Sequence, residues 1–329
     1  MDDLSLAELG EIESLRRTVA RLKPGEHAIV GSGDDAAVVT ATDNFLVSTD
    51  TLVENHDFKL EWSTGFDLGF KSVASNLADI AAMGATPTVL VVAMVVPKTT
   101  KISWLESFAD GLQAACDQLS PGSAVVGGDL ASGEQIVISV TVHGKLDGQK
   151  PVLRSGATVG DVVAVCGPLG KAACGLTLLE SGQQDLIRSY DDWVGAQLRP
   201  EPPISQGVAA NLAGATAMLD VSDGLIKDLG RISKASNVSI EIDRSLLSGY
   251  EAMLDLPAQS LGVQTLGWVL QGGEDHSLLA TFPASATLPI SFKVIGKVVA
   301  KSDHDVLLDG KPVADTGWDS ITGTGGARR

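Results

Sequence analysis

Short apolar segments alternate with amphipathic segments along this chain, and this alternation constrains the fold more than any other feature. Strand-like runs are expected at 45–49, 88–96, 124–126, 162–166 and 217–221, and runs with apolar residues at helical spacing at 4–22, 65–84 and 102–119. Strands interleaved with helices predict an α/β or α+β fold. The polar stretch at 147–160, rich in Gly and Pro, is the best candidate for a domain boundary. We therefore expect two domains, residues 1–148 and 149–329.

The balance of charge limits the possible partners. The chain carries 41 acidic and 24 basic residues, for a net charge of −17, and it has no basic block. Such a surface repels nucleic acid and anionic membranes, so we expect neither as a partner. Phosphates approach carboxylates only where cations lie between them. An acidic site that handles phosphates would therefore imply a bound divalent metal.

The cysteines and the apolar runs indicate a compartment. Cys116, Cys166 and Cys174 form no CxxC pair, and we expect them to be reduced and buried. The first residues are acidic and contain no apolar stretch of the kind found in secretory signals. The longest apolar run, Val89–Pro97, is too short to span a bilayer. We expect a cytoplasmic protein.

Acidic residues recur where the expected strands stop, most of them beside Gly, Ser or Thr. These positions are Asp34, Asp35, Asp50, Asp129, Asp220, Asp223, Glu274 and Asp275. Ligand sites of α/β sheets concentrate at strand ends, where loops carry polar groups on a rigid base. Any one of these clusters is equally consistent with a simple turn, because Asp and Gly are turn residues. Their number favours a shared metal site.

One face of the expected helix at 65–84 is small and polar. Asp79 shares this face with Ser72, Ser75 and Asn76. Short polar side chains let a helix pack close to bound ions, whereas a solvated face usually carries Lys and Glu. We therefore favour a functional role for Asp79 over an ordinary solvated face.

The segment 219–225, Leu-Asp-Val-Ser-Asp-Gly-Leu, is the most informative local motif. On a strand, Asp220 and Ser222 would point to one side, and Asp223 would stand at the start of the next helix. Two carboxylates and one hydroxyl within four residues form a compact set of oxygen ligands suited to Mg²⁺. Asp-Gly turns are common, so the motif alone also fits a turn.

Familiar phosphate- and metal-binding motifs are absent from the sequence. It contains no GxxxxGK[ST] loop, no GxGxxG fingerprint after a strand and no zinc spacing among its five His. A nucleotide phosphate therefore needs another cation. Arg154 is our candidate, because a guanidinium holds two phosphate oxygens at once. From this segment alone, an arginine on a surface loop is an equally good interpretation.

Seven segments occur in the order found in thiamine-monophosphate kinases, and the chain resembles that family from about residue 29 to Trp318. The segments are GSGDDAAVV, STDTLVE, NLADIAAMGATPT, VVGGD, RSGA, MLDVSDGL and GGED. Some are shared with the wider superfamily of aminoimidazole ribonucleotide synthetase. The resemblance implies the two-domain fold of that superfamily. Its N-terminal α/β domain binds ATP and Mg²⁺ and dimerises through its sheet, and its C-terminal α/β domain completes the ATP and substrate site.

The resemblance also implies a reaction and a set of site residues. The γ-phosphoryl group of ATP would pass directly to thiamine monophosphate, giving thiamine diphosphate and ADP, with several Mg²⁺ ions bound. The implied metal ligands are Asp35, Ser48, Thr49, Asp50, Asp79, Asp129, Asp220 and Asp223. The implied ATP contacts are Gly128, Asp129, Arg154 and Ser222, and the implied substrate contacts are His56 or Asp57, Glu274 and Trp318. Because the acceptor is itself a phosphate, we nominate no catalytic base.

The sequence departs from the family pattern at two places. The family usually has a His near the substrate where this chain has Asp57, and His56 precedes that position. Asp275 is followed by His276 and Ser277, where an aromatic and an acidic residue are more usual. The alternatives are another ATP-dependent enzyme of the same superfamily and a non-catalytic nucleotide-binding relative. Against the first, the chain lacks the N-terminal Cys–Lys pairing of selenophosphate synthetase and the C-terminal Cys of the hydrogenase-maturation enzyme.

Overall fold

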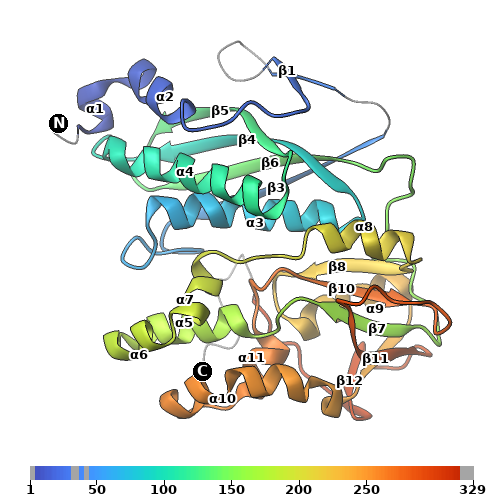
Figure 1. Cartoon of the computed structure of the whole chain (residues 1–329). Coiled ribbons are helices and arrows are strands. Elements are labelled where there is room, and N and C mark those ends of the chain that lie inside the picture. The colour runs from blue at the N-terminus through green and yellow to red at the C-terminus, as the bar shows by residue number, and fades with distance from the viewer. Residues whose placement is uncertain (1–3, 31–36, 41–43, 319–329) are drawn as a thin grey trace. The chain divides into compact units, whose positions relative to one another are not determined.

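The computed structural model of the chain describes residues 4–30, 37–40 and 44–318. It divides into two compact units (Figure 1), one formed by residues 1–80 and 85–148 and the other by residues 81–84 and 149–329. Helices and strands alternate through both units. The mixed α/β architecture predicted from the sequence is therefore confirmed.

The first unit contains a four-stranded sheet and a two-stranded sheet. Its elements are α1 (Leu6–Leu9), α2 (Glu11–Val19), β1 (Ala28–Val30), β2 (Val38–Val39), β3 (Phe45–Val53), α3 (Gly65–Ala82), β4 (Thr86–Val96), α4 (Ile102–Leu119), β5 (Ala124–Ser132) and β6 (Val137–Lys145). The helix expected at 4–22 is interrupted at Gly10, whose φ of 80° is a left-handed conformation that glycine adopts readily.

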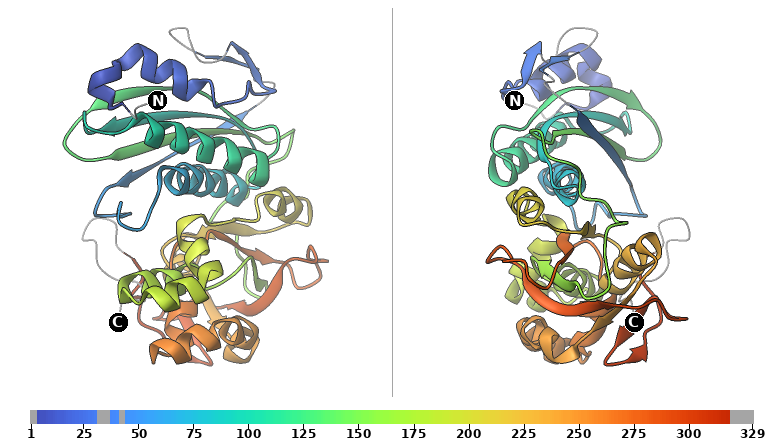
Figure 2. Two further views of the ribbon diagram at one scale, coloured as in Figure 1. Left: turned by 60° about the vertical axis from the view of Figure 1, so that its left-hand side comes forward. Right: turned by 90° about the vertical axis from the view of Figure 1, so that its right-hand side faces the viewer.

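The four-stranded sheet, in the order β3-β6-β4-β5, buries one of its faces. Along β6, the alternate residues Ile138, Val140 and Val142 are fully buried, and the residues between them are partly exposed. Helices α3 and α4 cover the buried face (Figures 1 and 2). On β3, the opposite face carries Phe45 and Val47, which are 60% and 55% exposed. The N-terminal part of β3 therefore presents two apolar side chains on the open face.

Strands β3 and β5 continue beyond the ends that the sequence predicts. Because β3 runs to Val53 and β5 to Ser132, Asp50 and Asp129 lie inside strands. The expectation that these two residues mark strand ends is wrong. The physical reason is pairing: β6 satisfies the backbone of β3 along its full length, and β4 does so for most of β5, which outweighs the weak strand preference of Asp and Gly.

Helices α3 and α4 approach each other closely because glycines stand at their contact. A Cβ atom on Gly69 would lie 2.1 Å from the carbonyl oxygen of Phe108, and one on Gly111 would lie 2.1 Å from that of Phe66. Only glycine leaves room for this approach. The contact holds α3, the helix that carries Asp79, at a fixed place.

The second unit is built on a seven-stranded sheet in the order β13-β12-β9-β11-β7-β10-β8. Its strands are β7 (Val162–Cys166), β8 (Ala217–Val221), β9 (Ser239–Ile242), β10 (Ser277–Phe282), β11 (Lys293–Val299), β12 (Val306–Leu308) and β13 (Lys311–Pro312). Its helices are α5 (Lys171–Ser181), α6 (Gln184–Ser189), α7 (Asp191–Leu198), α8 (Ser205–Leu212), α9 (Leu225–Ser236), the 3₁₀-helix η1 (Arg244–Leu247), α10 (Ser248–Leu261) and α11 (Thr265–Gln271).

The sheet topology of the second unit brings two acidic segments to one edge. Strands β7 and β8 both run antiparallel to β10, with Leu278 opposite Cys166 on one side and Asp220 on the other. The C-terminal ends of β7 and β8 therefore lie beside the N-terminal end of β10. The segment 220–223 closes β8, and the segment 272–276 precedes β10. Both β8 and β10 are buried along their whole length, which gives this edge a rigid base.

Candidate active site

The turn after β8 carries three of the expected site residues, Asp220, Ser222 and Asp223. Asp220 is 5% exposed, and Ser222 and Asp223 are half-buried. Gly224 follows at a φ of 115°, and α9 begins at Leu225. This left-handed conformation favours glycine, so the Asp-Gly pair turns the chain sharply from strand to helix. The structure thus brings these three residues together.

Asp228, near the start of α9, fixes the turn after β8 through hydrogen bonds to its backbone. One of its carboxylate oxygens accepts the backbone N–H groups of Ser222 and Asp223, each at 3.1 Å. The side chain is fully buried, and burial raises the pKa of Asp228 to about 7, against the lowering effect of Arg231. Asp228 therefore sets the backbone from which Ser222 and Asp223 project.

Arg231 joins Asp228 to Asp223. Its guanidinium donates to both carboxylates, and it stands one turn further along α9. An arginine between two carboxylates neutralises part of their charge and fixes their orientation. Asp223 is thus held both through its backbone and through its side chain.

The segment before β10 packs against the same turn. The backbone N–H of Glu274 donates to Ser222 O at 2.9 Å, and that of His276 donates to Val221 O at 3.0 Å. Both residues have a positive φ, 65° for Glu274 and 49° for His276. Residues other than glycine seldom adopt such values. Strained backbone of this kind concentrates at functional sites.

The side chains of this segment contact Asp220 and helix α7. His276 Nδ1 donates to Asp220 Oδ2 at 2.9 Å, and both side chains are buried. Gln197, on α7, donates to Glu274. The family departure at His276 therefore places an imidazole directly on the carboxylate of Asp220.

Trp318 is tied to the same turn through its backbone. Its N–H donates to Asp223 O at 3.0 Å, and its carbonyl accepts from the ammonium of Lys227. The residue is half-buried. Trp318 thus lies beside the expected metal-ligand turn, although the sequence separates it from Asp223 by more than ninety residues.

Arg154 lies elsewhere in the second unit. The carbonyl of the preceding Leu153 accepts the N–H of Met218, near the start of β8, and Arg154 itself is exposed. The structure therefore places Arg154 beside the beginning of β8, and it places Asp220 and Asp223 at the end of that strand.

Asp275 anchors the loop that follows β7. Its carboxylate accepts the N–H groups of Gly170 at 2.5 Å and Ala172 at 2.8 Å. The residue is 3% exposed. Burial raises the pKa of Asp275 to about 7, and the backbone N–H donors act in the opposite direction. The side chain thus joins the segment before β10 to the start of α5.

In the first unit, the structure brings Ser48 and Asp79 into contact. Ser48 Oγ donates to Asp79 Oδ2 at 2.6 Å. Asp50 follows Ser48 by two residues on β3, so the two side chains share one face of the strand, and both are half-buried. Thr49 points to the other face, where its hydroxyl donates to Val140 O at 2.9 Å. Ser72, Ser75 and Asn76 are buried, which excludes the solvated face considered for α3.

Gly128 and Asp129 lie on β5, which β6 and β4 separate from β3. Gly128 is required by packing, because a Cβ there would lie 2.1 Å from Val92 O. Asp129 pairs with Ala93, which pairs in turn with Ser139 and through it with Thr51. Residues in one such row share a face, so Asp129 lies on the face of Thr51, opposite that of Asp50.

His56 and Asp57 occupy a tight turn after β3. Asp57 Oδ2 accepts the N–H of Val53 at 2.8 Å, and Asp57 Oδ1 accepts from His56 Nδ1 at 2.9 Å. Asp57 therefore closes the turn and orients the imidazole. Asp35, the remaining expected metal ligand, and its neighbour Asp34 lie outside the described residues.

Comparisons with known proteins agree with this arrangement. Residues 33–146 match the family model of the AIR synthase related protein, N-terminal domain. A thiamine-monophosphate kinase of Mycobacterium tuberculosis is 41% identical over 96% of this chain and 93% of its own. The chain belongs to the thiamine-monophosphate kinase family. The solved kinase of Stenotrophomonas maltophilia is 32% identical, with a TM-score of 0.78 over 95% of this chain and 99% of its own.

A further solved structure, of AaThiL complexed with AMPPCP and TMP, is 30% identical to this member of the kinase family. It covers 97% of this chain and 99% of its own, with a TM-score of 0.77. The two-domain fold implied by the resemblance is therefore confirmed. Within the residues that the structure describes, none of the helices combines the length and apolar character needed to cross a bilayer.

The oxygen donors of this kinase-family chain suit Mg²⁺ in each unit taken by itself. Asp220, Ser222 and Asp223 in one unit, and Ser48, Asp50 and Asp79 in the other, offer the hard oxygen ligands that this ion takes. The guanidinium of Arg231 contacts the Asp223 carboxylate and places a positive charge beside it. In the part of the chain that the structure describes, no three His, Cys, Asp or Glu side chains form a ready metal site.

Several residues around the kinase site could not be found from the motifs. Asp228, Arg231 and Gln197 contact expected site residues through bonds that only the fold creates. One signal was available: Asp228 is an acidic residue in the first turn of a helix that directly follows an acidic loop, a place where a carboxylate meets free backbone N–H groups.

Proposed function

We propose that this protein transfers the γ-phosphoryl group of ATP to the phosphate of thiamine monophosphate, giving thiamine diphosphate and ADP. The observation that carries the proposal is the full-length likeness to thiamine-monophosphate kinases. It is supported by the related structure complexed with AMPPCP, a nonhydrolysable ATP analogue, and TMP, the acceptor.

The transfer needs no general base. The bond between the γ-phosphorus and the oxygen that bridges to the β-phosphorus breaks, and its electron pair leaves with ADP. A bond forms between the γ-phosphorus and an oxygen of the acceptor phosphate, which is already anionic near neutral pH. Catalysis of such transfers rests on positioning and on stabilising charge. The chain's contribution is therefore to hold oxygen ligands and substrates in fixed places.

We propose Mg²⁺ as the cofactor. The ligands of several ions would be Asp35, Ser48, Thr49, Asp50, Asp79, Asp129, Asp220 and Asp223. Because Asp50 and Asp129 lie on opposite faces of the sheet within one chain, these two would hold different ions. When bound, Mg²⁺ neutralises phosphate charge and stabilises the charge of the transferring group. The contacts of His276 with Asp220 and of Asp228 with the turn support this role, because they hold the carboxylates in place.

The nucleotide and acceptor contacts are proposals of the same kind. Gly128, Asp129, Arg154 and Ser222 would contact ATP, and Glu274 and Trp318 would contact the acceptor. We propose that His56, and not Asp57, takes the place of the family His. This is supported by the bonds of Asp57, whose carboxylate closes the turn and accepts from the imidazole.

We further propose a homodimer, a cytoplasmic location and a division of roles between residues 1–148 and 149–329. The first domain would bind ATP and Mg²⁺ and dimerise, and the second would complete the site. The apolar open face of the first unit's sheet, with Phe45 and Val47 exposed, supports the dimer.

The proposed reaction is tested by incubating the purified protein with ATP and thiamine monophosphate and quantifying ADP and thiamine diphosphate. Equal amounts of both products are expected with Mg²⁺, and none after chelation with EDTA. Unphosphorylated thiamine serves as the control acceptor and should yield no product. Failure to form thiamine diphosphate in the presence of Mg²⁺ would reject the proposal.

A further inference from the structure

The departure from the family pattern at His276 involves an expected metal ligand. This chain has a histidine where an aromatic residue is more usual in the family. Its Nδ1 lies 2.9 Å from Asp220 Oδ2. Because an ionised carboxylate only accepts hydrogen bonds, Nδ1 carries the hydrogen and donates it. A phenyl ring at this position would offer no such donor.

The backbone on both sides of His276 fixes the imidazole in place. The N–H of His276 donates to Val221 O at 3.0 Å, and the hydroxyl of the next residue, Ser277, donates to Pro168 O. The φ of His276 is 49°, a left-handed value that His adopts more readily than most residues. The side chains of His276 and Asp220 are both buried. The hydrogen bond to Asp220 is therefore a built feature of the segment before β10.

This hydrogen bond engages only one of the two Asp220 carboxylate oxygens. Among the described residues, the other oxygen, Oδ1, accepts no hydrogen bond. Asp223 is held in the same way, because the guanidinium of Arg231 donates to its Oδ2. Each carboxylate of the turn after β8 thus has one oxygen bound to the protein and one that remains for a ligand.

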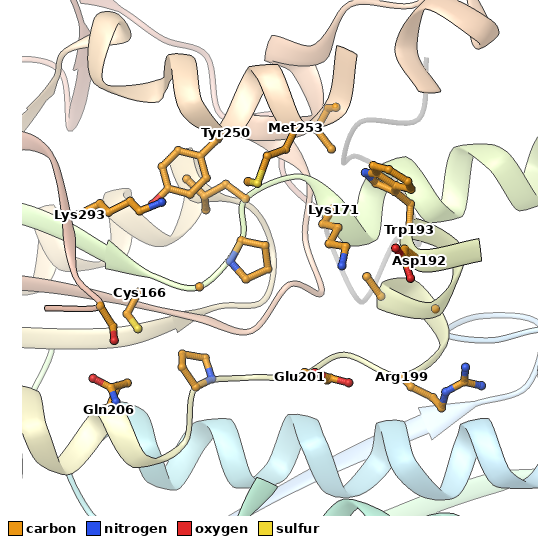
Figure 3. Close-up of a pocket in the computed structure, with 18 of the residues that line it drawn as sticks. Cys166, Lys171, Asp192, Trp193, Arg199, Glu201, Gln206, Tyr250, Met253 and Lys293 are labelled. Atoms are coloured by element: carbon orange, nitrogen blue, oxygen red, sulfur yellow. The ribbon is translucent and has the colours of Figure 1, made fainter. Parts of the chain in front are cut away.

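Other carboxylates of the second unit surround a separate cavity. Asp192 and Glu201 line a cavity of about 1160 Å³, together with the loop after β7 and residues of α10 (Figure 3). Asp220, Asp223 and His276 are not among the described residues that line it. The carboxylates of this cavity therefore do not supplement those of the turn after β8.

A carboxylate that presents a single oxygen discriminates between cations. Mg²⁺ has a small, nearly octahedral shell and is usually held through one or two carboxylates together with water and substrate phosphates. Ca²⁺ takes about six to eight oxygens, and it can take both oxygens of one carboxylate. Hydrogen bonds to one oxygen of Asp220 and one of Asp223 oppose the two-oxygen mode that Ca²⁺ can use. They leave the one-oxygen mode that suits Mg²⁺.

We propose that His276 is a positioning residue that makes the turn after β8 select Mg²⁺ over Ca²⁺, by keeping Asp220 a one-oxygen ligand. This inference rests on the proposed Mg²⁺ site and deepens it. An aromatic residue in place of His276 would leave Asp220 able to turn and to offer both oxygens. The histidine thus acts through Asp220 and decides which ion the turn prefers.

The test compares wild type with His276→Phe and His276→Asn. Phe keeps a ring of similar size and removes the donor, and an aromatic residue is the more usual one here in the family. Asn tolerates the positive φ and places an amide N–H near the position of Nδ1. His304→Phe is the matched control, because His304 is exposed and precedes β12, toward the other edge of the sheet from β8.

Binding of Mn²⁺ in the presence of AMPPCP, followed by the electron paramagnetic resonance signal of the free ion, would count the bound ions. Mg²⁺ and Ca²⁺ would then be added as competitors. For one of the bound ions, the ratio of the Ca²⁺ Kd to the Mg²⁺ Kd should fall about tenfold in His276→Phe, the lower end of the effect of outer-shell partners. In His276→Asn and His304→Phe the ratio should stay within about twofold of wild type.

A merely structural role for His276 would give a different result, because a loosened turn would weaken the binding of both cations by the same factor and leave their ratio unchanged. His276→Ala removes the donor without a second ring and should lower the ratio as His276→Phe does. An unchanged ratio in both variants would overturn the inference, and so would an equal fall in His276→Asn.

Inhibition by Ca²⁺ provides a second readout that separates this inference from the proposed function. At a fixed Mg²⁺ concentration, the Ca²⁺ concentration that halves formation of thiamine diphosphate should be about tenfold lower in His276→Phe than in wild type. If the variants change the ratio of Kd values but wild type forms no thiamine diphosphate, the proposed function falls and the selection of Mg²⁺ stands. Normal wild-type turnover with unchanged ratios rejects the role of His276 alone.

Discussion

Asp228 shows how a fully buried residue can determine the shape of a site. Its carboxylate holds the backbone of Ser222 and Asp223 and accepts from Arg231. Asn in its place retains one oxygen acceptor but loses the charge that pairs with the guanidinium. We expect Asp228→Asn to lower kcat/KM for ATP by about 10-fold to 100-fold, as loss of outer-shell partners does elsewhere. Steady-state kinetics at saturating acceptor would measure this.

The matched control for Asp228→Asn is Asp255→Asn, which removes one carboxylate from the exposed side of α10. It should leave kcat/KM for ATP within twofold of wild type, roughly the scatter expected for a surface change. An equal loss in both variants would mean that net charge, and not the hold on the turn, controls the rate.

Asp275 makes the stability of the protein depend on pH. Burial raises its pKa to about 7, compared with about 4 in an unfolded chain. The folded state therefore binds this proton more tightly. The contribution of Asp275 to stability is complete below about pH 4 and is lost as the pH rises through about 7. Asp275→Asn lacks this titrating group and therefore its pH-dependent contribution to stability. The free energy of unfolding of wild type, relative to that of the variant, should fall by up to about 4 kcal/mol between about pH 4 and about pH 7.

Urea denaturation of wild type and Asp275→Asn at a series of pH values would measure this difference. The free energy of unfolding of the variant should increase relative to that of wild type as the pH rises. The variant can still be the less stable protein at low pH, because Asn offers one acceptor oxygen fewer to the N–H groups of Gly170 and Ala172. A difference that stays constant from pH 4 to about 8 would show that Asp275 remains ionised throughout.

At the level of elements, the contact between α3 and α4 depends on glycine. A Cβ on Gly69 would collide with the carbonyl oxygen of Phe108 at 2.1 Å, so Gly69→Ala must push the helices apart. Overpacking of this kind costs about 1–3 kcal/mol. Thermal denaturation should show a lower midpoint for Gly69→Ala than for wild type.

Gly230→Ala provides the matched control, because a Cβ at that position in α9 would meet no atom within 4 Å among the described residues. Removing a glycine from a helix interior usually stabilises by about 0.5–1 kcal/mol. The two Gly→Ala changes should therefore shift the midpoint in opposite directions. Shifts of the same sign would contradict the packing argument.

The regular helices and buried strands of this protein could be predicted from its sequence, and the partly exposed continuations of β3 and β5 could not. The helix expected at 102–119 and the strands at 162–166 and 217–221 have the bounds of α4, β7 and β8, because their apolar pattern is regular. The extension of β5 through Gly128 and Asp129 was missed because it depends on pairing with β4. That Asp129 and Asp50 lie on different faces of the sheet likewise depends on how the strands pair, and only the register of the folded sheet shows it.

The candidate site shows the same limit. Asp220, Ser222 and Asp223 were found because one short segment holds them all. The nearness of Glu274 and Trp318 to that segment follows from β10 and from the backbone bond of Trp318 to Asp223, which no local pattern encodes. Physical reasoning on the sequence singled out Glu274 as one of the acidic residues at strand ends, and the family resemblance supplied its substrate role and Trp318.

At the scale of the whole molecule, the proposed dimer explains the exposed apolar face of the first unit. Phe45 and Val47 lie on β3, at the edge of the four-stranded sheet, and are 60% and 55% exposed. Placing a charge on both should remove the apolar surface on which a second copy would pack. We expect wild type to have about twice the 34.0 kDa mass of one chain, and the Phe45→Glu, Val47→Glu double variant to have the mass of one.

Light scattering coupled to size-exclusion chromatography would measure these masses over a range of protein concentrations. Ile290→Glu is the control, since Ile290 is a fully exposed apolar residue of the second unit, and it should leave the dimer intact. A monomeric wild type at micromolar concentration would contradict the dimer, and so would a double variant that keeps the larger mass. Because Phe45 and Val47 are already exposed in the single chain, the double variant should keep its fold, which its circular dichroism spectrum would establish.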